Sequence, residues 1–368
     1  MEPVSVPPGH TAERSGTRAV LRAVHGEVGV SADAATLAEL GTLSAPFLTP
    51  APWPEQAAPG GLPSVLVREA PPRGGAWQRV SYSSEYEPDR VLWMDRERLR
   101  VAVVGPPSSW RDQQVLRSVR NLLRWQSYAR GDLFVHGGLV GVGGKGIAFL
   151  GGKRSGKTSS ILSALLNGRA DFVSNDDVVF TGDDTGLTGH GFPRSVNLRT
   201  DALLALAAAH PGLTSLLTGT SHPTNGFRGR HFTTEALTTE QGEVLPGSVW
   251  VRCAELAAVT GCALRPAGEL TAVVFPAFDD AAVDPVPQRL EAGEARAALL
   301  ENVEDRALKY DPFLAQWFPT THRERRTELI DRLIREVPCY RLRQNMRHLR
   351  TATHALFTEL GLRPGERR

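Results

Sequence analysis

The hydrophobic and polar residues of this 368-residue chain follow different patterns in successive segments. In the first part of the chain, short apolar runs at 28–30, 65–67 and 99–104 alternate with loops, which predicts strands. From Trp110 to about Arg130, apolar residues recur at i, i+4, i+7 and i+8, which predicts an amphipathic helix. The alternation of strands and helices favours an α/β fold.

The polar face of this predicted helix carries a row of four arginines, Arg111, Arg117, Arg120 and Arg124. Such a row could attract an anionic ligand, but a run of like charges along a helix is usually its solvated face. We therefore expect these guanidinium groups to lie in water, and we assign them no chemistry. Ser109 is the expected cap at the start of the helix.

After Gly131 the pattern changes to two strands, FVHGGLVGV and GIAFL, separated by Gly143, Gly144 and Lys145. Two apolar strands around a Gly-rich turn predict a hairpin. The second strand runs directly into GGKRSGKT and then into a helical segment, TSSILSALLNG. The next predicted strand is DFVSNDDVVF, and the residues GDDTG after it are typical of a turn.

These patterns divide the chain into three expected parts. Residues 1–105 are expected to form a small N-terminal α/β domain, and 106–290 a P-loop catalytic domain. Residues 291–368 read as a mainly helical portion with one strand at 338–342.

The composition excludes several classes of protein. The chain has 42 Lys plus Arg against 40 Asp plus Glu, a net charge of +2, so a global field for nucleic acid is not expected. The three cysteines form neither a disulfide framework nor a cysteine zinc site, which favours a reducing compartment. The N-terminus lacks the pattern of a signal peptide, and the longest apolar stretch, 203–209, is too short for a membrane span. We expect a cytoplasmic protein that uses no membrane.

The segment GGKRSGKT matches the phosphate-loop (Walker A) pattern GxxxxGK[ST] in full, between a strand and a helix. Its glycines allow successive N–H groups to turn toward phosphate oxygens at a helix N-terminus. Lys157 is expected to reach the β- and γ-phosphates, and Thr158 offers a hydroxyl to Mg²⁺. The expected nucleotide-binding residues are Gly151, Gly152, Lys153, Arg154, Ser155, Gly156, Lys157, Thr158 and Ser159. The sequence therefore predicts binding of a nucleoside triphosphate, ATP in our interpretation, with Mg²⁺.

Such a loop needs a carboxylate that helps to hold the metal. Asp183 and Asp184 lie in the predicted turn, so we interpret them as structural. Asp176 and Asp177 lie within or at the end of a predicted strand, where paired carboxylates are costly unless a cation meets them. Both can serve one site only if the strand ends or bulges there. One of them would then bind Mg²⁺ while the other accepts a proton from an attacking hydroxyl.

The order of His-Gly, hairpin, phosphate loop and Asp-Asp over residues 134–180 resembles the HPr kinase/phosphorylase family. That family shares a fold core, with a mixed sheet, with ATP-dependent phosphoenolpyruvate carboxykinase. The outer segments GFPRSVNLR and VPCYRL are similar to a looser set of HPr-kinase-like proteins, several of which accompany peptide natural-product clusters. The resemblance implies ATP- and Mg²⁺-dependent phosphorylation of a serine hydroxyl on a peptide or protein, and assembly into a homo-oligomer.

The resemblance also implies roles for single residues. His136 would lie beside the transferring phosphate, and Asp176 with Asp177 would divide metal binding and general-base work. Our assignment is Asp177 as base and Asp176, together with Thr158, as metal ligand. The loop departs from the glycine arrangement of HPr kinases and their downstream signature is missing, so HPr itself is not the expected acceptor.

A phosphoryl-transfer site needs added positive charge in its transition state. Arg194 and Arg230, which follow the Asp pair, are our candidates for that charge, with Arg199 and Arg228 as neighbours of the same kind. Two other functions stay open at this point. One is a carboxykinase-like or other small-molecule phosphotransferase, and the other is a nucleotide-dependent regulatory module.

Overall fold

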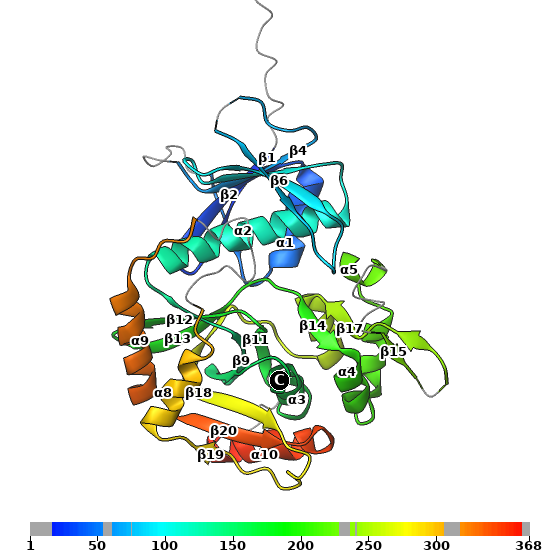
Figure 1. Cartoon of the computed structure of the whole chain (residues 1–368), viewed down its shortest axis with the longest axis vertical. Helices are drawn as coiled ribbons and strands as arrows, with labels where there is room; N and C mark the ends of the chain where they lie inside the picture. Colours follow the sequence, from blue (N-terminus) through cyan, green and yellow to red (C-terminus); the bar gives the residue numbers. More distant parts are fainter. Residues whose placement is uncertain are drawn as a thin grey trace, which may run out of the picture.

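The computed structural model describes residues 17–53, 61–74, 76–227, 236–239, 241–304 and 317–362. Within these residues the chain forms two large sheets that mix parallel and antiparallel pairing, and the long helix α2 (Ser109–Ala129) lies between them (Figure 1). The expected α/β character is confirmed, and the mixed sheets are consistent with a nucleotide-binding α/β fold.

The N-terminal sheet has seven strands in the order β3-β1-β2-β4-β7-β6-β5. The pairs β2–β4 and β4–β7 are parallel, and the other neighbours are antiparallel. Helices α1 (Ala34–Ser44) and α2 lie beneath this sheet (Figure 1). The strands are β1 (Thr17–Ala23), β2 (Gly26–Ala32), β3 (Thr49–Ala51), β4 (Ser64–Arg68), β5 (Gln78–Tyr82), β6 (Arg90–Asp95) and β7 (Arg100–Val104). The three strands predicted in this part of the chain fall in β2, β4 and β7.

Helix α2 confirms the predicted amphipathic helix, with one change at its start. Ser108, not Ser109, is the cap, because its hydroxyl accepts a hydrogen bond from the backbone N–H of Arg111 at 3.2 Å. The chain leaves the helix at Gly131, where φ is +85°. Leu122 and Leu123 of the apolar face are fully buried against the N-terminal sheet.

The expectation of a solvated arginine face on α2 was wrong. Arg111, Arg120 and Arg124 are buried, and Arg117 is half-buried. The helix is covered by the N-terminal sheet on one side and by the second sheet on the other, so its polar face meets protein instead of water (Figure 1). These guanidinium groups therefore need carboxylate partners inside the molecule.

The second sheet has nine strands, seven of them in the order β11-β9-β10-β18-β13-β12-β8, with β20 beside β18 and β19 beside β20. The pairs β10–β18 and β18–β20 are parallel. The strands are β8 (Leu133–Val135), β9 (Gly137–Val142), β10 (Lys145–Leu150), β11 (Asp171–Ser174), β12 (Val178–Asp183), β13 (Gly186–Gly191), β18 (Ala267–Phe278), β19 (Gln288–Arg289) and β20 (Cys339–Gln344). Strands β9 and β10 form the predicted hairpin, and the phosphate loop joins β10 to α3 (Lys157–Asn167).

The predicted single strand over 171–180 is instead two strands in separate positions of the sheet. β11 pairs with β9, whereas β12 pairs with β13 and β8. Between them residues 175–177, which we call the acid turn, change the direction of the chain, and Asp176 has a φ of +67°. Asp and Asn tolerate this left-handed conformation better than most residues do. The strand therefore ends at the Asp pair, and GDDTG forms the predicted turn between β12 and β13.

The remaining elements flank the second sheet. A small sheet of β14 (Val196–Arg199) and β17 (Ser248–Val251) lies with α4 (Thr200–Ala207), α5 (Pro223–Gly226) and α7 (Cys253–Thr260). Another two-stranded sheet is formed by β15 (Leu237–Thr238) and β16 (Val244–Leu245). The described residues also form the 3-10 helices η1 (Pro211–Leu217) and η4 (Met346–His348).

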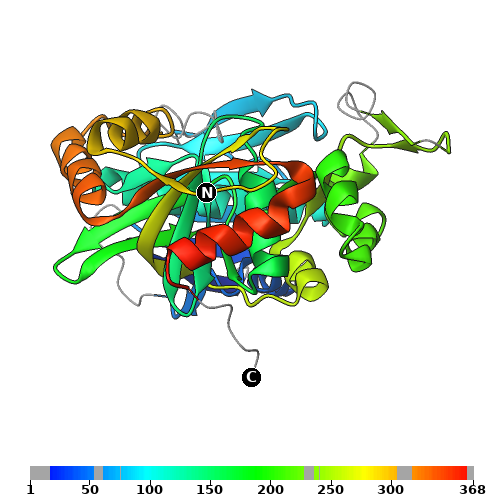
Figure 2. The ribbon, with the colours of Figure 1, turned by 90° about the horizontal axis from the view of Figure 1, so that it is seen from below.

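The last part of the chain adds α8 (Ala292–Leu300), α9 (Arg323–Glu336) and α10 (Leu349–Glu359). α10 packs against α3 and crosses in front of the sheet in Figure 2. Because β20 joins β18, strands from either side of residue 290 share one sheet. The three-part division of the chain stays a prediction.

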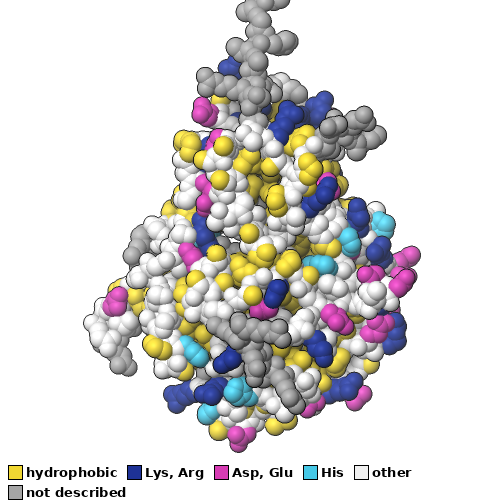
Figure 3. All heavy atoms as spheres, turned by 180° about the vertical axis from the view of Figure 1, so that it is seen from behind, with side chains coloured by type: hydrophobic (Ala, Val, Ile, Leu, Met, Phe, Trp, Pro, Cys, Tyr) yellow, Lys and Arg dark blue, Asp and Glu magenta, His cyan; other side chains and the backbone are white. Residues whose placement is uncertain are grey.

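The surface gives no sign of a single-charge field on the face shown in Figure 3, where basic and acidic side chains are interspersed. Among the helices that the structure describes, none is both long and apolar enough to cross a bilayer.

Cys253, Cys262 and Cys339 are free thiols, as expected, and burial raises the pKa of Cys253 to about 12 and that of Cys339 to about 11.

Gly138 in β9 permits a close contact with α3 and with the acid turn, since an added Cβ would lie 2.2 Å from Cδ1 of Ile161 and 2.8 Å from the carbonyl oxygen of Ser174. We expect Gly138→Ala to lower the free energy of unfolding by roughly 1–3 kcal/mol, the usual cost of overpacking, in urea denaturation. Gly41→Ala is the matched control, because an added Cβ there meets nothing within 4 Å. It should stabilise helix α1 by about 0.5–1 kcal/mol, and equal effects of the two changes would contradict the packing described here.

Candidate functional site

The phosphate loop has the backbone shape that its sequence predicts. Gly151 and Gly156 have φ values of +152° and +99°, and Arg154 between them has a φ of +67°. An added Cβ at Gly151 would lie 2.6 Å from the Oγ of Ser155, so the loop requires glycine there. No side chain caps the N-terminus of α3, which leaves its first N–H groups available to an anion.

The ammonium group of Lys157 lies inside the loop. Its Nζ donates hydrogen bonds to the carbonyl oxygens of Gly151 at 2.6 Å and Gly152 at 2.9 Å, and the side chain is buried. The lysine is thus held over the space that the loop encloses, where a phosphate oxygen would find a positive charge already in place.

A cavity of about 440 Å³ opens beside the loop. Six of the predicted nucleotide-binding residues line it, namely Arg154, Ser155, Gly156, Lys157, Thr158 and Ser159. Gly151, Gly152 and Lys153 do not line it, and the Lys153 side chain is exposed. The lining also includes Asn197, Phe278 and Met346, which are far from the loop in sequence and which no motif indicated.

The start of α3 is joined to the acid turn by a hydrogen bond. The hydroxyl of Thr158 donates to Oδ1 of Asn175 at 3.2 Å. Asn175 is buried, and its Nδ2 makes no hydrogen bond within the described residues. Sequence reasoning missed Asn175, although its position directly before the Asp pair could have indicated it. The predicted metal-binding hydroxyl and the predicted carboxylates therefore lie in one place.

The two aspartates of the acid turn have different surroundings. The side chain of Asp177 is 1% exposed, and that of Asp176 is 26% exposed. The backbone carbonyl of Asp177 accepts a hydrogen bond from the Ser174 hydroxyl, which holds the turn closed. Asp177 thus points into the protein, and Asp176 lies toward solvent.

Buried arginines from α2 meet Asp177. Nη2 of Arg124 lies 3.1 Å from Oδ1 of Asp177 and 3.0 Å from Oε2 of Glu304, and Nε of Arg120 lies 4.0 Å from Oδ2 of Asp177. Burial, with a smaller contribution from nearby Arg194, lowers the pKa of Arg120 to about 9, so this group keeps its charge at neutral pH.

Arg194 lies near Asp176, on the solvent-accessible side of the acid turn. Its Nη2 lies 4.0 Å from Oδ2 of Asp176, and its side chain is 15% exposed. The structure thus brings Arg194 to the acid turn, whereas Arg199 pairs with Asp201 at 2.8 Å on the wall of the loop cavity. Arg228 and Arg230 lie outside the described residues.

Strand pairing places His136 near the acid turn. Val135 of β8 pairs with Val178 of β12 in antiparallel register. The register continued by one residue past the end of each strand sets His136 opposite Asp177. The backbone N–H of His136 donates to the carbonyl oxygen of Asn302 at 2.8 Å. The sheet therefore brings the His-Gly segment and the Asp pair together.

The donor set of the site fits Mg²⁺. Within the described residues no three His, Cys, Asp or Glu side chains gather into a metal site made by protein alone. Mg²⁺ prefers oxygen ligands and needs only one or two from the protein when phosphates supply others. The Thr158 hydroxyl and the Asp176 carboxylate are such donors, so a triphosphate and these two residues could hold the ion between them.

Comparison with known proteins finds likeness only among solved structures. No protein-family model matches the sequence, and no curated protein matches it. Among the solved structures 68 chains match, including the HPr(Ser) kinase/phosphatase from Coxiella burnetii, which is 8% identical. That match covers 61% of this chain and 95% of the other, with a TM-score of 0.26. The relationship is a distant structural one, and at this score it carries no argument about function.

The Arg124–Asp177 pair should be strongly coupled in stability. Arg124→Met leaves the Asp177 carboxylate buried with weakened compensation, so we expect a loss of about 3–5 kcal/mol in urea denaturation. Adding Asp177→Asn should recover part of that loss, because the uncompensated charge is removed. Strictly additive effects of the two changes would show that the charges do not depend on each other.

Proposed function

We propose that this protein is an ATP- and Mg²⁺-dependent kinase that transfers the γ-phosphate to a serine hydroxyl of a peptide or protein. The proposal rests on one observation, the junction of the phosphate loop with the acid turn through the hydrogen bond from Thr158 to Asn175. A phosphate-binding loop, a hydroxyl for the metal and an accessible carboxylate are the parts that phosphoryl transfer to a hydroxyl requires.

In this proposal the nucleotide lies in the loop cavity. The backbone N–H groups at the start of α3 bind the phosphates, and Lys157 exchanges its contacts with Gly151 and Gly152 for phosphate oxygens. Thr158 and Asp176 would hold Mg²⁺, and a bound ion would neutralise charge on the triphosphate. Arg194, the most exposed arginine of the acid-turn group, supplies positive charge to the transferring phosphoryl.

The burial of Asp177 changes the assignment of the general base. A base must come within hydrogen-bond distance of the acceptor hydroxyl. Asp177 is closed in by Arg124, whereas Asp176 reaches the accessible side, so we assign proton acceptance to Asp176 in addition to its place near the metal. Asp177 then acts as a positioning residue that fixes the acid turn through its ion pair.

The two roles predict different results for two matched variants. Asp176→Asn should reduce phosphoryl transfer by at least about a hundredfold, the usual contribution of general-base catalysis, with little change in thermal stability. Asp177→Asn should lower both stability and turnover, because it weakens a buried ion pair. Turnover is measured by transfer of labelled γ-phosphate, and stability by thermal unfolding. If Asp176→Asn kept full turnover with a true acceptor, the assignment to Asp176 would be wrong.

The acceptor class is tested by incubating the protein with labelled ATP, Mg²⁺ and separate pools of peptides and metabolites. A labelled phosphoserine peptide supports the proposed kinase, and a labelled metabolite supports the small-molecule phosphotransferase. Slow release of inorganic phosphate alone supports the regulatory module. Lys157→Ala is the control for all three, because loss of the loop ammonium should abolish each reaction.

A further inference from the structure

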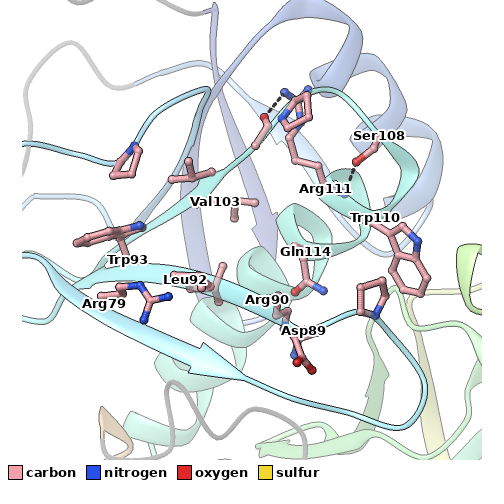
Figure 4. Close-up of a pocket in the computed structure, with 16 residues that line it drawn as sticks. Arg79, Asp89, Arg90, Leu92, Trp93, Val103, Ser108, Trp110, Arg111 and Gln114 are labelled. Carbon is pink, nitrogen blue, oxygen red and sulfur yellow. Dashed lines mark hydrogen bonds between the residues drawn. The ribbon is translucent and has the colours of Figure 1, made fainter. Parts of the chain in front are cut away.

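A second cavity, of about 460 Å³, is lined by residues between Pro71 and Gln114, none of which belongs to the phosphate loop (Figure 4). It is an open groove lined mainly by β6, β7 and the first turns of α2. Leu92 and Val103 supply apolar surface, and Trp93 and Trp110 lie on opposite sides of the view. The cavity therefore offers an apolar floor between two indole rings, an environment suited to an apolar side chain.

Buried polar groups without hydrogen-bond partners line this cavity. Gln114 is 7% exposed, and its Nε2 donates to Glu87 at 3.0 Å, but its Oε1 accepts no hydrogen bond within the described residues. Nε of buried Arg111 likewise makes no hydrogen bond there, although its Nη atoms donate to Gly105, Asp33 and Thr36. Nε of Arg111 also lies 4.0 Å from Oδ1 of Asp112. Buried polar groups are normally hydrogen-bonded, so the unpaired acceptor of Gln114 is the stronger sign of a missing partner.

The rim of the cavity carries one cation and one anion that lack ionic partners. Arg79 is exposed and donates to the Ser81 hydroxyl at 3.0 Å, and no carboxylate of the described chain lies within ion-pair distance of it. Asp89 is exposed and has no cation at that distance among the same residues. Arg90, which Figure 4 draws between these two side chains, is already paired with Glu87. In Figure 4, Arg79 and Asp89 lie on either side of Leu92.

We propose that this cavity is a docking site for an extended peptide segment of the acceptor. An apolar side chain of the segment packs on Leu92 and Val103, and a backbone peptide N–H donates to Gln114. An acidic side chain on one flank pairs with Arg79, and a basic side chain on the other pairs with Asp89. A peptide N–H supplies the donor that Oε1 of Gln114 lacks. The choice of a peptide ligand rests on the proposed function, whereas the site itself does not.

The fold sets the spacing between this docking site and the site of phosphoryl transfer. Gln114 and Arg124 both lie on α2, and ten residues of helix span about 15 Å. Arg124 contacts Asp177 of the acid turn. An extended chain advances about 3.3 Å per residue, so the docking segment and the phosphorylated serine must be separated by at least about five residues.

Binding can be measured without nucleotide, by fluorescence anisotropy of a labelled synthetic peptide. Two peptides are compared, Gly-Gly-Glu-Leu-Lys-Gly-Gly and its charge-swapped form, Gly-Gly-Lys-Leu-Glu-Gly-Gly. The peptide with the lower dissociation constant is then used in the variant measurements. Glu→Gln in the peptide and Arg79→Gln in the protein should each weaken binding about three- to fivefold, and the pair together should weaken it no further. The same cycle applies to the peptide Lys and Asp89→Asn.

Gln114→Leu should also weaken binding, since it removes the carbonyl acceptor. Arg350→Gln, an exposed arginine on the distant α10, is the matched control and should have no effect. The proposal is wrong if neither peptide binds at millimolar concentration, or if binding is the same in wild type, Arg79→Gln and Gln114→Leu.

The failure of this proposal and that of the proposed function are distinguishable. Lys157→Ala should bind the peptide normally while losing phosphoryl transfer. A peptide with serine six residues from the leucine should be phosphorylated by wild type, and one with serine three residues away should not. Binding without any phosphorylation would contradict the kinase and leave the docking site in place, whereas phosphorylation at both spacings without measurable binding would contradict the docking site alone.

Discussion

The buried ion pair between Arg124 of α2 and Asp177 of the acid turn connects the two halves of this structure. Its nitrogen and oxygen lie 3.1 Å apart, and both side chains are essentially excluded from water. Each charge is tolerated inside the protein because the other is present. The apolar face of α2 packs under the N-terminal sheet, so the pair ties that sheet to the turn that carries both predicted catalytic carboxylates.

Around this pair the second sheet gathers groups that are dispersed along the chain. Thr158 at the start of α3 bonds to Asn175, strand pairing sets His136 opposite Asp177, and Arg194 closes the accessible side. Gly138 lets the hairpin approach α3 and the acid turn closely enough for these contacts to form. The geometry separates one inward carboxylate from one that reaches solvent, which is how two chemically identical residues can take different roles.

The features that were predicted correctly depend on local rules. The hairpin, the glycine conformations of the loop after it and the helix that follows depend on glycine positions and on the period of apolar residues, which neighbours in sequence determine. The single strand over 171–180 was predicted wrongly, because the apolar residues on both sides of the Asp pair mask a turn at which Asp176 takes a positive φ. The arginine face of α2 was predicted to lie in water, which was wrong. The periodicity of a helix shows which residues share a face but not which other segments cover that face. Arg124 meets Glu304, which lies 180 residues away.

The sequence by itself determined the α/β class and the glycine-rich loop between β10 and α3, and it nominated Lys157, Thr158 and the Asp pair, since each is written in residues adjacent along the chain. Only the tertiary structure decided that Asp177 is buried and Asp176 accessible, that Arg120 and Arg124 lie beside Asp177, and that Asn197, Phe278 and Met346 help to line the loop cavity. The physical reason is that burial and charge compensation are properties of contacts between distant segments, and those contacts exist only when both sheets have formed around α2.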